Sequence, residues 1–402
     1  MKPSIDIIKN KCTGCYGCFN ACVERAIKML LNNEGFVEPV VNRSVCKECG
    51  RCQEHCPMIK VRYPEQRLEM PKVFAAWSND DEIRVQSSSG GVFMEIASFI
   101  LKKGGVVFGA SFDYSSFTVK HILVDNFEKL KTLRGSKYVQ SHVNDTYRKV
   151  IHIAEKSKPV LFSGTPCQVA ALNTFLAKVT ADVKSKIFTC EVICHGIASE
   201  IVFKSYLQYI SNNFKHSKIV GISFRDKSIS WEEYGMKITF SNGEEYFRPY
   251  WKDPFMIGYL RNMYLRQVCY ECPFAKIPRV SDITLGDFWG VPEELNDPRG
   301  VSVVIVNTIK GERLLDRINI EKVPISIEQV SPYNPRIVSG YLRINPDRNK
   351  FYELLRSQGF QAAAKKYLKP TSKYQKVMLK AKFMISKILN KFVILNKSSV
   401  KS

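Results

Sequence analysis

The chain has 402 residues, 45% of them hydrophobic and 24% charged, with 22 Gly and 18 Pro. This composition is that of a globular protein with room for about two or three domains, and it excludes a disordered, collagenous or coiled-coil chain. No apolar run approaches the roughly 20 residues of a membrane-spanning helix, and the first residues lack the apolar core of a signal peptide. We therefore expect the protein to stay in the cytoplasm.

Two features of the composition point to chemistry. Eight of the 13 cysteines fall within the first 56 residues. Because a reducing cytoplasm disfavours disulfide frameworks, such a density of cysteine indicates metal or redox chemistry. The formal net charge is +22, from 60 basic and 38 acidic residues. A basic balance of this size favours nucleic acid, an anionic membrane surface or acidic ligands as partners.

The N-terminal cysteines form two copies of one motif, C-x2-C-x2-C-x3-C, and Pro57 follows the second copy. This spacing is typical of a two-cluster ferredoxin, in which three thiolates of a run bind one 4Fe–4S cluster and the fourth binds the other. We therefore assign one cluster to Cys12, Cys15, Cys18 and Cys56. The second is assigned to Cys46, Cys49, Cys52 and Cys22. A pair of zinc sites is the alternative, which the third and fourth cysteines of each run disfavour.

A predicted linker, residues 58–71, is followed from Lys72 to about Val330 by alternating strand-like and helix-like segments. Gly90-Gly91 open an apolar-periodic helix that ends at a second Gly pair, and Asn242-Gly243 predict a hairpin over 236–247. Strands are predicted at residues 73–78, 106–113, 159–164, 186–193, 218–225 and 301–307. The fold class is therefore α/β with some antiparallel strands.

Two short segments of this region combine helix starts with reactive or donor groups. Ser87 to Gly91 supply hydroxyls and unhindered N–H groups at a helix start, which suits either a phosphate site or an ordinary N-cap. Thr165 and Pro166 predict another helix start, with Cys167 in its first turn. There the helix dipole is expected to lower the thiol pKa, and a buried small residue is the alternative.

Three further segments carry groups that bind metals or move protons. Cys190, Cys194 and His195 follow a predicted strand, and Cys269 and Cys272 form a C-x2-C pair. Asp282 and Asp287 are expected in a Gly-bounded loop with Trp289. His195 is a candidate proton donor because His titrates near neutrality, and a structural histidine is the alternative.

At these motifs the chain resembles the coenzyme F-420 hydrogenase/dehydrogenase beta-subunit family. The eight-cysteine segment resembles the N-terminal part of that family. Later segments of the chain resemble the successive sequence blocks of the family in the same order, so that the resemblance covers about residues 10–290. These blocks are SSSGGVF, GGVVFGASF, LRGSKYVQS, FSGTPCQVAAL, CHG, SFRDK, CYECPFA and SDITLGDFWG. Members are iron–sulfur flavoproteins, so the resemblance implies FAD in the central domain.

The resemblance also implies which residues contact FAD. By position they are Ser87, Ser89, Gly90, Gly91, Gly135, Ser136, Lys137, Tyr138, Ser163, Gly164, Thr165 and Pro166. Five cysteines remain outside the N-terminal runs, and a third 4Fe–4S cluster needs four. On count and resemblance we assign it to Cys167, Cys194, Cys269 and Cys272, which leaves Cys190 as a strand residue.

Half of the excess positive charge lies in residues 361–402, which contain 11 Lys and no Asp or Glu. On a helical wheel Lys373, Lys376, Lys380, Lys387 and Lys391 form one stripe, opposite a broad apolar arc. Such a helix lies on an anionic membrane, docks a partner, or packs on the main domain with its lysines in solvent. Nucleic acid is disfavoured because the tail lacks interleaved stacking aromatics.

These observations predict an α+β/α/β protein: a two-cluster ferredoxin-like domain (1–60), a mixed α/β flavin-binding domain (72–355) and a basic amphipathic helical tail (361–402). The expected activity is electron transfer between 4Fe–4S clusters, FAD and a hydride-accepting substrate, either a deazaflavin coenzyme or another small molecule. A one-electron donor or acceptor protein is the expected partner, and the location is the cytoplasm or the inner face of the membrane. The alternatives are an electron-transfer adaptor with no substrate of its own that feeds a partner enzyme, and a flavin-free structural iron–sulfur protein. No G-x-G-x-x-G motif stands out in the sequence, so direct nicotinamide binding is not supported.

Overall fold

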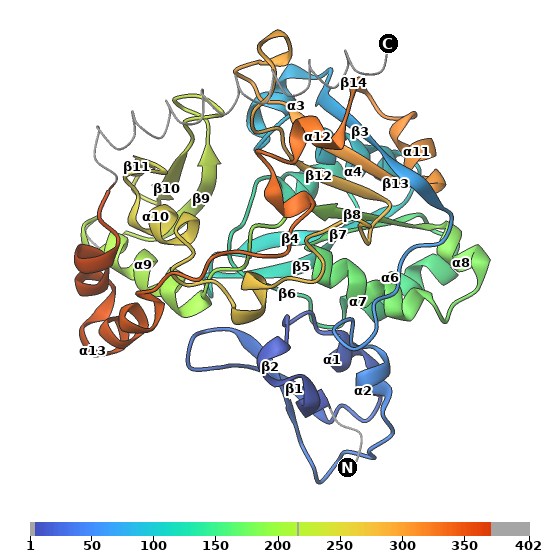
Figure 1. Ribbon diagram of the computed structural model, residues 1–402, viewed down its shortest axis with the longest axis horizontal. Coiled ribbons are helices and arrows are strands. Elements are labelled where there is room, and N and C mark those ends of the chain that lie inside the picture. The colour runs from blue at the N-terminus through green and yellow to red at the C-terminus, as the bar shows by residue number, and fades with distance from the viewer. Residues whose placement is uncertain (1–4, 215–216, 371–402) are drawn as a thin grey trace, which may run out of the picture.

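The computed structural model describes residues 5–214 and 217–370 (Figure 1). Its centre is a nine-stranded mixed sheet in the order β14-β3-β13-β12-β8-β7-β4-β5-β6. The strands are β3 (Arg67–Ser78), β4 (Val106–Asp113), β5 (Thr118–Val124), β6 (Ser141–His142), β7 (Val160–Gly164), β8 (Ile187–Val192), β12 (Ile283–Asp287), β13 (Ser302–Thr308) and β14 (Ile320–Ile325). β4, β7, β8 and β12 run parallel, whereas β3, β13 and β14 pair antiparallel at one edge.

Helices cover both faces of this sheet because its central strands are apolar on both sides. Phe108 of β4 and Phe162 of β7 pack towards α6 (Thr146–Glu155) and α7 (Pro166–Leu176). The neighbouring Val107 and Leu161 pack on the other face with α4 (Val92–Lys102) and α11 (Ile309–Leu315). Each fully buried side chain of this kind stabilises the fold by about 1.5–3 kcal/mol. The shorter helices are α3 (Asp81–Gln86), α5 (Phe127–Leu130), η2 (Lys131–Leu133), α8 (Ala181–Ser185), η3 (Gln267–Tyr270), η4 (Glu293–Leu295), α12 (Ile327–Val330) and η5 (Pro335–Ile337).

A second lobe packs a three-stranded antiparallel sheet against helices. It consists of β9 (Ile219–Asp226), β10 (Gly235–Phe240), β11 (Glu245–Pro249), α9 (Glu200–Asn212), α10 (Pro254–Leu260) and α13 (Arg348–Tyr367). Its core is aromatic: Phe203, Phe224 and Phe255 lie in mutual ring contact and are fully buried. β9 leads from this lobe towards the large sheet.

The N-terminal segment (residues 5–62) lies beneath the large sheet (Figure 1). It contains η1 (Ile5–Lys11), α1 (Gly17–Ala21), the antiparallel pair β1 (Ile27–Leu31) and β2 (Val37–Val41), and α2 (Arg51–Glu54). α1 contacts α6 and α7, and the Tyr147 hydroxyl of α6 donates to the Cys15 carbonyl oxygen at 2.7 Å. The first cysteine run is therefore packed directly on the central domain.

All six predicted strands and the predicted hairpin are present, as is the helix after Gly91. Two other expectations were wrong. The linker 58–71 ends early, because β3 begins at Arg67 and pairs with β13 through an irregular register between Val306 and Thr308. Residues 283–287 form the central strand β12, not a loop; Gly and Asp are rare in strands, but burial between β8 and β13 overrides that preference. Strands β1, β2, β5, β6 and β14 were not predicted.

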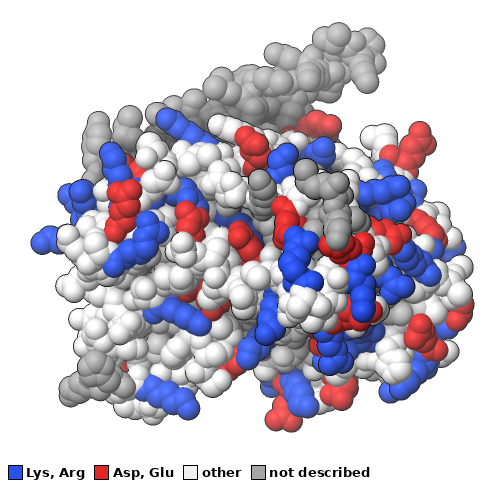
Figure 2. Space-filling model, turned by 90° about the horizontal axis from the view of Figure 1, so that it is seen from below, with Lys and Arg blue, Asp and Glu red and all other residues white. Residues whose placement is uncertain are grey.

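The start of the predicted basic tail belongs to the second lobe. α13 crosses residue 361, with a break at Gly359 (φ 79°, ψ 178°), and Phe360, Ala363 and Leu368 are buried in the aromatic core. The lysine stripe from Lys373 to Lys391, and with it the proposed membrane or partner contact, lies outside the described residues. On the face seen in Figure 2 basic and acidic side chains are interspersed. Among residues 5–214 and 217–370, no helix is both long and apolar enough to cross a membrane.

Candidate functional site

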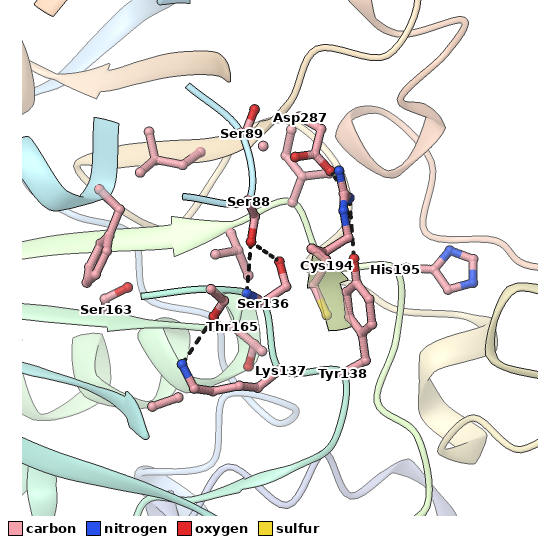
Figure 3. Close-up of a pocket in the computed structure, with 18 of the residues that line it drawn as sticks. Ser88, Ser89, Ser136, Lys137, Tyr138, Ser163, Thr165, Cys194, His195 and Asp287 are labelled. Atoms are coloured by element: carbon pink, nitrogen blue, oxygen red, sulfur yellow. Dashed lines mark hydrogen bonds and ion pairs between the residues drawn. The ribbon is translucent and has the colours of Figure 1, made fainter. Parts of the chain in front are cut away.

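The main cavity has a volume of ≈ 550 Å³ and lies where the loops after β3, η2, β7 and β8 meet β9 and β12 (Figure 3). Ten of the twelve residues expected to contact FAD line it: Ser87, Ser89, Gly91, Gly135, Ser136, Lys137, Tyr138, Ser163, Gly164 and Thr165. Gly90 and Pro166 are absent from the lining. The Gly90 N–H donates to the Ser302 hydroxyl at 2.9 Å, and a Cβ there would lie 2.4 Å from the Ala76 carbonyl oxygen. The fold therefore places most of the residues that the resemblance assigns to FAD around one cavity.

Two of the lining loops are joined through Ser88, which sequence reasoning left out. Its hydroxyl oxygen accepts from the Ser136 N–H at 3.0 Å and lies 3.1 Å from the Ser136 hydroxyl (Figure 3). The Ser87 and Ser89 hydroxyls instead donate to the backbone carbonyls of Ile83 and Val301. Ser88 thus fixes the spacing of the two loops, while its neighbours fix the first loop to the scaffold.

Lys137 holds the second loop in shape. Its ammonium donates to the carbonyl oxygens of Leu133, Arg134 and Gly135 at 3.2, 3.0 and 3.1 Å. Burial lowers the Lys137 pKa to about 7. Gly135 has φ +85°, and a Cβ at this position would meet no atom within 4 Å. The backbone here is therefore open to whatever occupies the cavity.

The floor of the cavity contains a neutral histidine that no motif indicated. His121 Nε2 lies 3.0 Å from the Ser163 carbonyl oxygen, and Nδ1 lies 3.0 Å from the Ser141 hydroxyl. Because a carbonyl can only accept, Nε2 carries the proton. Burial lowers the His121 pKa to about 4, which keeps the ring neutral. Its partners come from β6 and β7, so only the assembled sheet identifies it.

At the far end of the cavity, Arg225 on β9 pairs with Asp287 on β12. The Arg225 Nη1 to Asp287 Oδ2 distance is 2.6 Å, and the Tyr138 hydroxyl lies 3.4 Å from the same nitrogen (Figure 3). Burial alone would lower the Arg225 pKa, but Asp287 and Tyr138 more than offset it, so the pKa is raised above its usual value. This end of the cavity therefore keeps a permanent cation.

A second, smaller cavity adjoins the first. Four of its lining residues are the cysteines assigned to the third cluster: Cys167, Cys194, Cys269 and Cys272. Arg336 donates to the carbonyl oxygens of Cys194 and Cys269 at 3.2 and 3.3 Å. Cys190 lines only the larger cavity. Five residues line both cavities and so separate the two spaces: Thr165, Cys194, Gly196, Ile197 and Arg336.

The prediction for the acidity of Cys167 was wrong. Burial, followed by repulsion from the thiolate charges of Cys15, Cys272 and Cys194, raises the Cys167 pKa well above its ordinary value. Pro166 and Thr165 do begin α7, and the Gln168 side chain accepts from the Thr165 N–H at 2.9 Å. Desolvation thus outweighs the dipole of a helix start.

The N-terminal cysteines fall into an inner and an outer set. Cys12, Cys15, Cys18 and Cys56 are buried, whereas Cys22, Cys46 and Cys52 are half-buried and Cys49 is exposed. Burial raises the Cys18 pKa, and the charges of Cys15, Cys12, Cys56 and Cys52 raise it further. Cys18 and Cys56 share one buried cluster, against which Cys22 and Cys52 pack. All 13 cysteines lie within the described residues and none forms a disulfide.

In the part of the chain that the structure describes, no three Cys, His, Asp or Glu side chains converge as ligands of a single metal ion. A 4Fe–4S cluster carries each of its four thiolates on a separate iron, so its ligands need not converge on one point.

His195 follows Cys194, but its imidazole is directed away from Cys194 and Tyr138 (Figure 3). Its Nε2 lies 2.8 Å from the Asn262 side-chain oxygen. Burial lowers the His195 pKa, while the Asn262 hydrogen bond partly opposes this. The geometry favours the structural alternative for this residue.

Comparison with known proteins gives two family matches, both to the beta subunit described as that of "Coenzyme F420 hydrogenase/dehydrogenase". Residues 73–147 match its N-terminal part, and residues 157–332 match its C-terminal part. Together the matches cover more than half of the chain. A similar solved chain, from a structure described as "Xenon derivatization of the F420-reducing [NiFe] hydrogenase complex from Methanosarcina barkeri", is 17% identical with a TM-score of 0.46. The match covers 75% of this chain and 91% of that one. No curated protein matches the sequence.

Proposed function

Because the chain belongs to the coenzyme F420 hydrogenase/dehydrogenase beta-subunit family, we propose that it is an iron–sulfur flavoprotein oxidoreductase that binds FAD in the main cavity and three 4Fe–4S clusters. The family contributes the iron–sulfur flavoprotein subunit of an oxidoreductase. When bound, FAD converts between one-electron and two-electron transfer. The proposed substrate is a hydride-accepting small molecule, a deazaflavin coenzyme or another reducible ring.

One observation carries this proposal: Cys194 lines both the main cavity and the four-cysteine cavity. A cluster held by Cys167, Cys194, Cys269 and Cys272 would then lie against the wall of the flavin site. The Arg336 donations to the carbonyls of Cys194 and Cys269 hold two of these ligands in place. Burial raises the pKa of Cys194 to about 12, so this side chain would be a thiolate only where a bound metal centre stabilised its charge.

The cavity fits FAD in size and in the groups that it offers. Its ≈ 550 Å³ lies within the range of cofactor pockets. The loops at 87–91, 133–138 and 163–165 would hold the cofactor, with Ser88 setting their spacing and Gly135 allowing close backbone approach. Lys137 and Arg134 place positive charge beside this wall, which suits the pyrophosphate.

For the N-terminal segment we propose a ferredoxin-like domain (1–60) on a flavin-binding domain (72–355). Cys15 of the inner set and Cys167 of the third set belong to the same hydrophobic cluster. The outer set reaches the surface at Cys49. The cysteine sets thus extend from the exposed Cys49 to the wall of the main cavity. This arrangement suits the transfer of electrons between a one-electron partner protein and the cavity.

The test is the absorption spectrum of anaerobically purified protein, with iron and flavin counted after acid release. The proposal predicts flavin and about twelve irons per chain. About eight irons with flavin would remove the third cluster. Iron without flavin, even after FAD is added back, would indicate the adaptor or the structural protein. Zinc with neither would overturn the proposal.

A further inference from the structure

The side chain of Arg225 is only 3% exposed, lines the main cavity, and has unused hydrogen-bonding capacity. Its Nη1 pairs with Asp287 and reaches Tyr138. Its Nε and Nη2 are buried and have no hydrogen-bond partner among the residues that the structure describes. Buried donors without acceptors are rare because leaving them unpaired is costly. Some acceptor absent from the protein itself is therefore expected at this edge.

Four other buried arginines show how far the fold satisfies such groups. Arg336, in the same cavity wall, donates from all three nitrogens to backbone carbonyls. Arg266 likewise has a partner for each nitrogen. Arg279 and Arg348 each leave one nitrogen unpaired, and neither lines the cavity. Only at Arg225, among these five, do two unpaired nitrogens coincide with the cavity.

The two unpaired nitrogens lie on one edge of the guanidinium, where Nε–H and Nη2–H point in parallel. Such an edge binds two acceptor atoms side by side. Aromatic rings pack against this guanidinium, whose carbon lies 3.8 Å from the Tyr234 ring centroid and 5.0 Å from that of Trp289. A ligand that accepts from both unpaired nitrogens lies in the plane of the guanidinium, because N–H groups donate along their own bond directions.

We propose that Arg225 binds the ligand of the main cavity through a pair of adjacent acceptor atoms, such as those of a carboxylate. This inference rests on the proposed function of the cavity. Two sources offer this chemistry: the pyrimidine edge of the flavin ring, with a ring nitrogen beside a carbonyl oxygen, and a carboxylate of the small-molecule substrate. Asp287 and Tyr138 then act as positioning residues, because they hold Nη1 and so orient the free edge.

Two titrations of flavin-free protein test the proposal and separate the sources. FAD binding is followed by flavin fluorescence, and binding of oxalate, a planar dicarboxylate probe, by tryptophan fluorescence, since Trp289 lies against Arg225. The variants are Arg225→Lys, which keeps the charge but lacks the paired donors, and Arg225→Gln, which lacks both. Arg356→Lys, at an exposed site on α13, is the matched control. Circular dichroism checks that each variant folds. If Arg225→Gln does not fold, Arg225→Lys alone decides the test.

If the flavin edge is the ligand, Arg225→Lys weakens FAD binding by about ten- to a hundredfold, the usual cost of losing charged hydrogen bonds. If a substrate carboxylate is the ligand, FAD binding is unchanged and the oxalate response is lost. Wild-type behaviour of Arg225→Lys in both titrations overturns the inference. Wild-type protein that binds no FAD contradicts the proposed function instead; the oxalate titration then decides alone, and absence of an oxalate response overturns this inference too.

Discussion

The guanidinium of Arg266 donates a 2.7 Å hydrogen bond to the carbonyl oxygen of Cys12, which lies 254 positions earlier in the chain. Its two other nitrogens donate to Gln140 and to the Val37 carbonyl oxygen at 2.8 and 2.6 Å. Gln140 in turn donates to the carbonyl of Gly14 at 3.0 Å. The first cysteine run is therefore held by donors of the central domain, and the two parts form one packed unit.

We expect Arg266→Ala to loosen this unit strongly. The substitution leaves the Cys12 and Val37 carbonyls and the Gln140 side chain without a buried donor, at a cost of about 1–3 kcal/mol for each group left unpaired. The free energy of unfolding in urea should fall by about 3 kcal/mol or more, and trypsin should release the N-terminal segment earlier. Arg356→Ala, at an exposed position, controls for the loss of an arginine. Equal stability of the two variants would contradict the docking role of Arg266.

If the third cluster is present, substitution of a proposed ligand and substitution of another buried cysteine should change the iron content differently. Cys272→Ser removes a proposed ligand, so iron should fall from about twelve to about eight per chain, with a matching loss of visible absorbance. Cys190→Ser is the matched control, because Cys190 is buried but lines only the main cavity. It should retain about twelve irons. Equal iron in the two variants would rule out this ligand set.

How far the sequence predicts this protein depends on the range of the interactions involved. The cysteine runs and the six predicted strands are local patterns, so spacing and periodicity identify them. β12 was misread because Asp282, which begins the DITLGD segment, resembles a loop residue. In the fold it is buried and accepts from the Thr189 N–H at 2.8 Å and from the Thr308 hydroxyl at 2.7 Å. Ser88 and His121 likewise matter only through partners that the sheet brings to them.

Lys137 predicts a pH dependence of FAD binding. Its pKa is lowered to about 7 in the folded protein, so its charge is lost as the pH rises through 7. FAD affinity, which the ammonium supports, should weaken between about pH 6 and about pH 9. Lys137→Met should bind FAD weakly at every pH, and fluorescence titration measures both curves. An unchanged pH slope in Lys137→Met would show that another group titrates.

The same group has the opposite effect on the stability of the flavin-free protein. The unfolded lysine keeps its proton up to its usual value of about 10.4, so between about pH 7 and that value the unfolded state binds more protons. The free energy of unfolding therefore rises with pH from this residue. Lys137→Met should lack that rise in urea unfolding at increasing pH, and an equal rise in both proteins would contradict the lowered pKa.

His195 allows a test of positioning against proton transfer. The His195 Nε2 bonds Asn262, and the ring points away from Cys194 and Tyr138. We therefore expect the His195→Gln variant to reduce a small quinone acceptor at a rate within about threefold of the wild-type rate. Loss of a general acid would instead cost about a hundredfold or more and shift the pH–rate profile. Asn262→Ala should produce the same small effect. A hundredfold loss with an altered profile would restore His195 as the proton donor.

Gly135 and Gly104 provide a matched pair for locating the cofactor. Both have positive φ, +85° and +72°, and a Cβ at either position would meet no protein atom within 4 Å. Alanine at each should therefore cost similar stability, about 1–2 kcal/mol for the left-handed backbone. Only Gly135 lines the main cavity, so only Gly135→Ala should weaken FAD binding, by about tenfold or more, since its methyl group occupies space that the cofactor needs. Thermal unfolding and FAD titration of both variants separate the two effects. Equal FAD affinities would place the cofactor away from the 133–138 loop, whereas a loss in Gly135→Ala alone would mark the wall against which it lies.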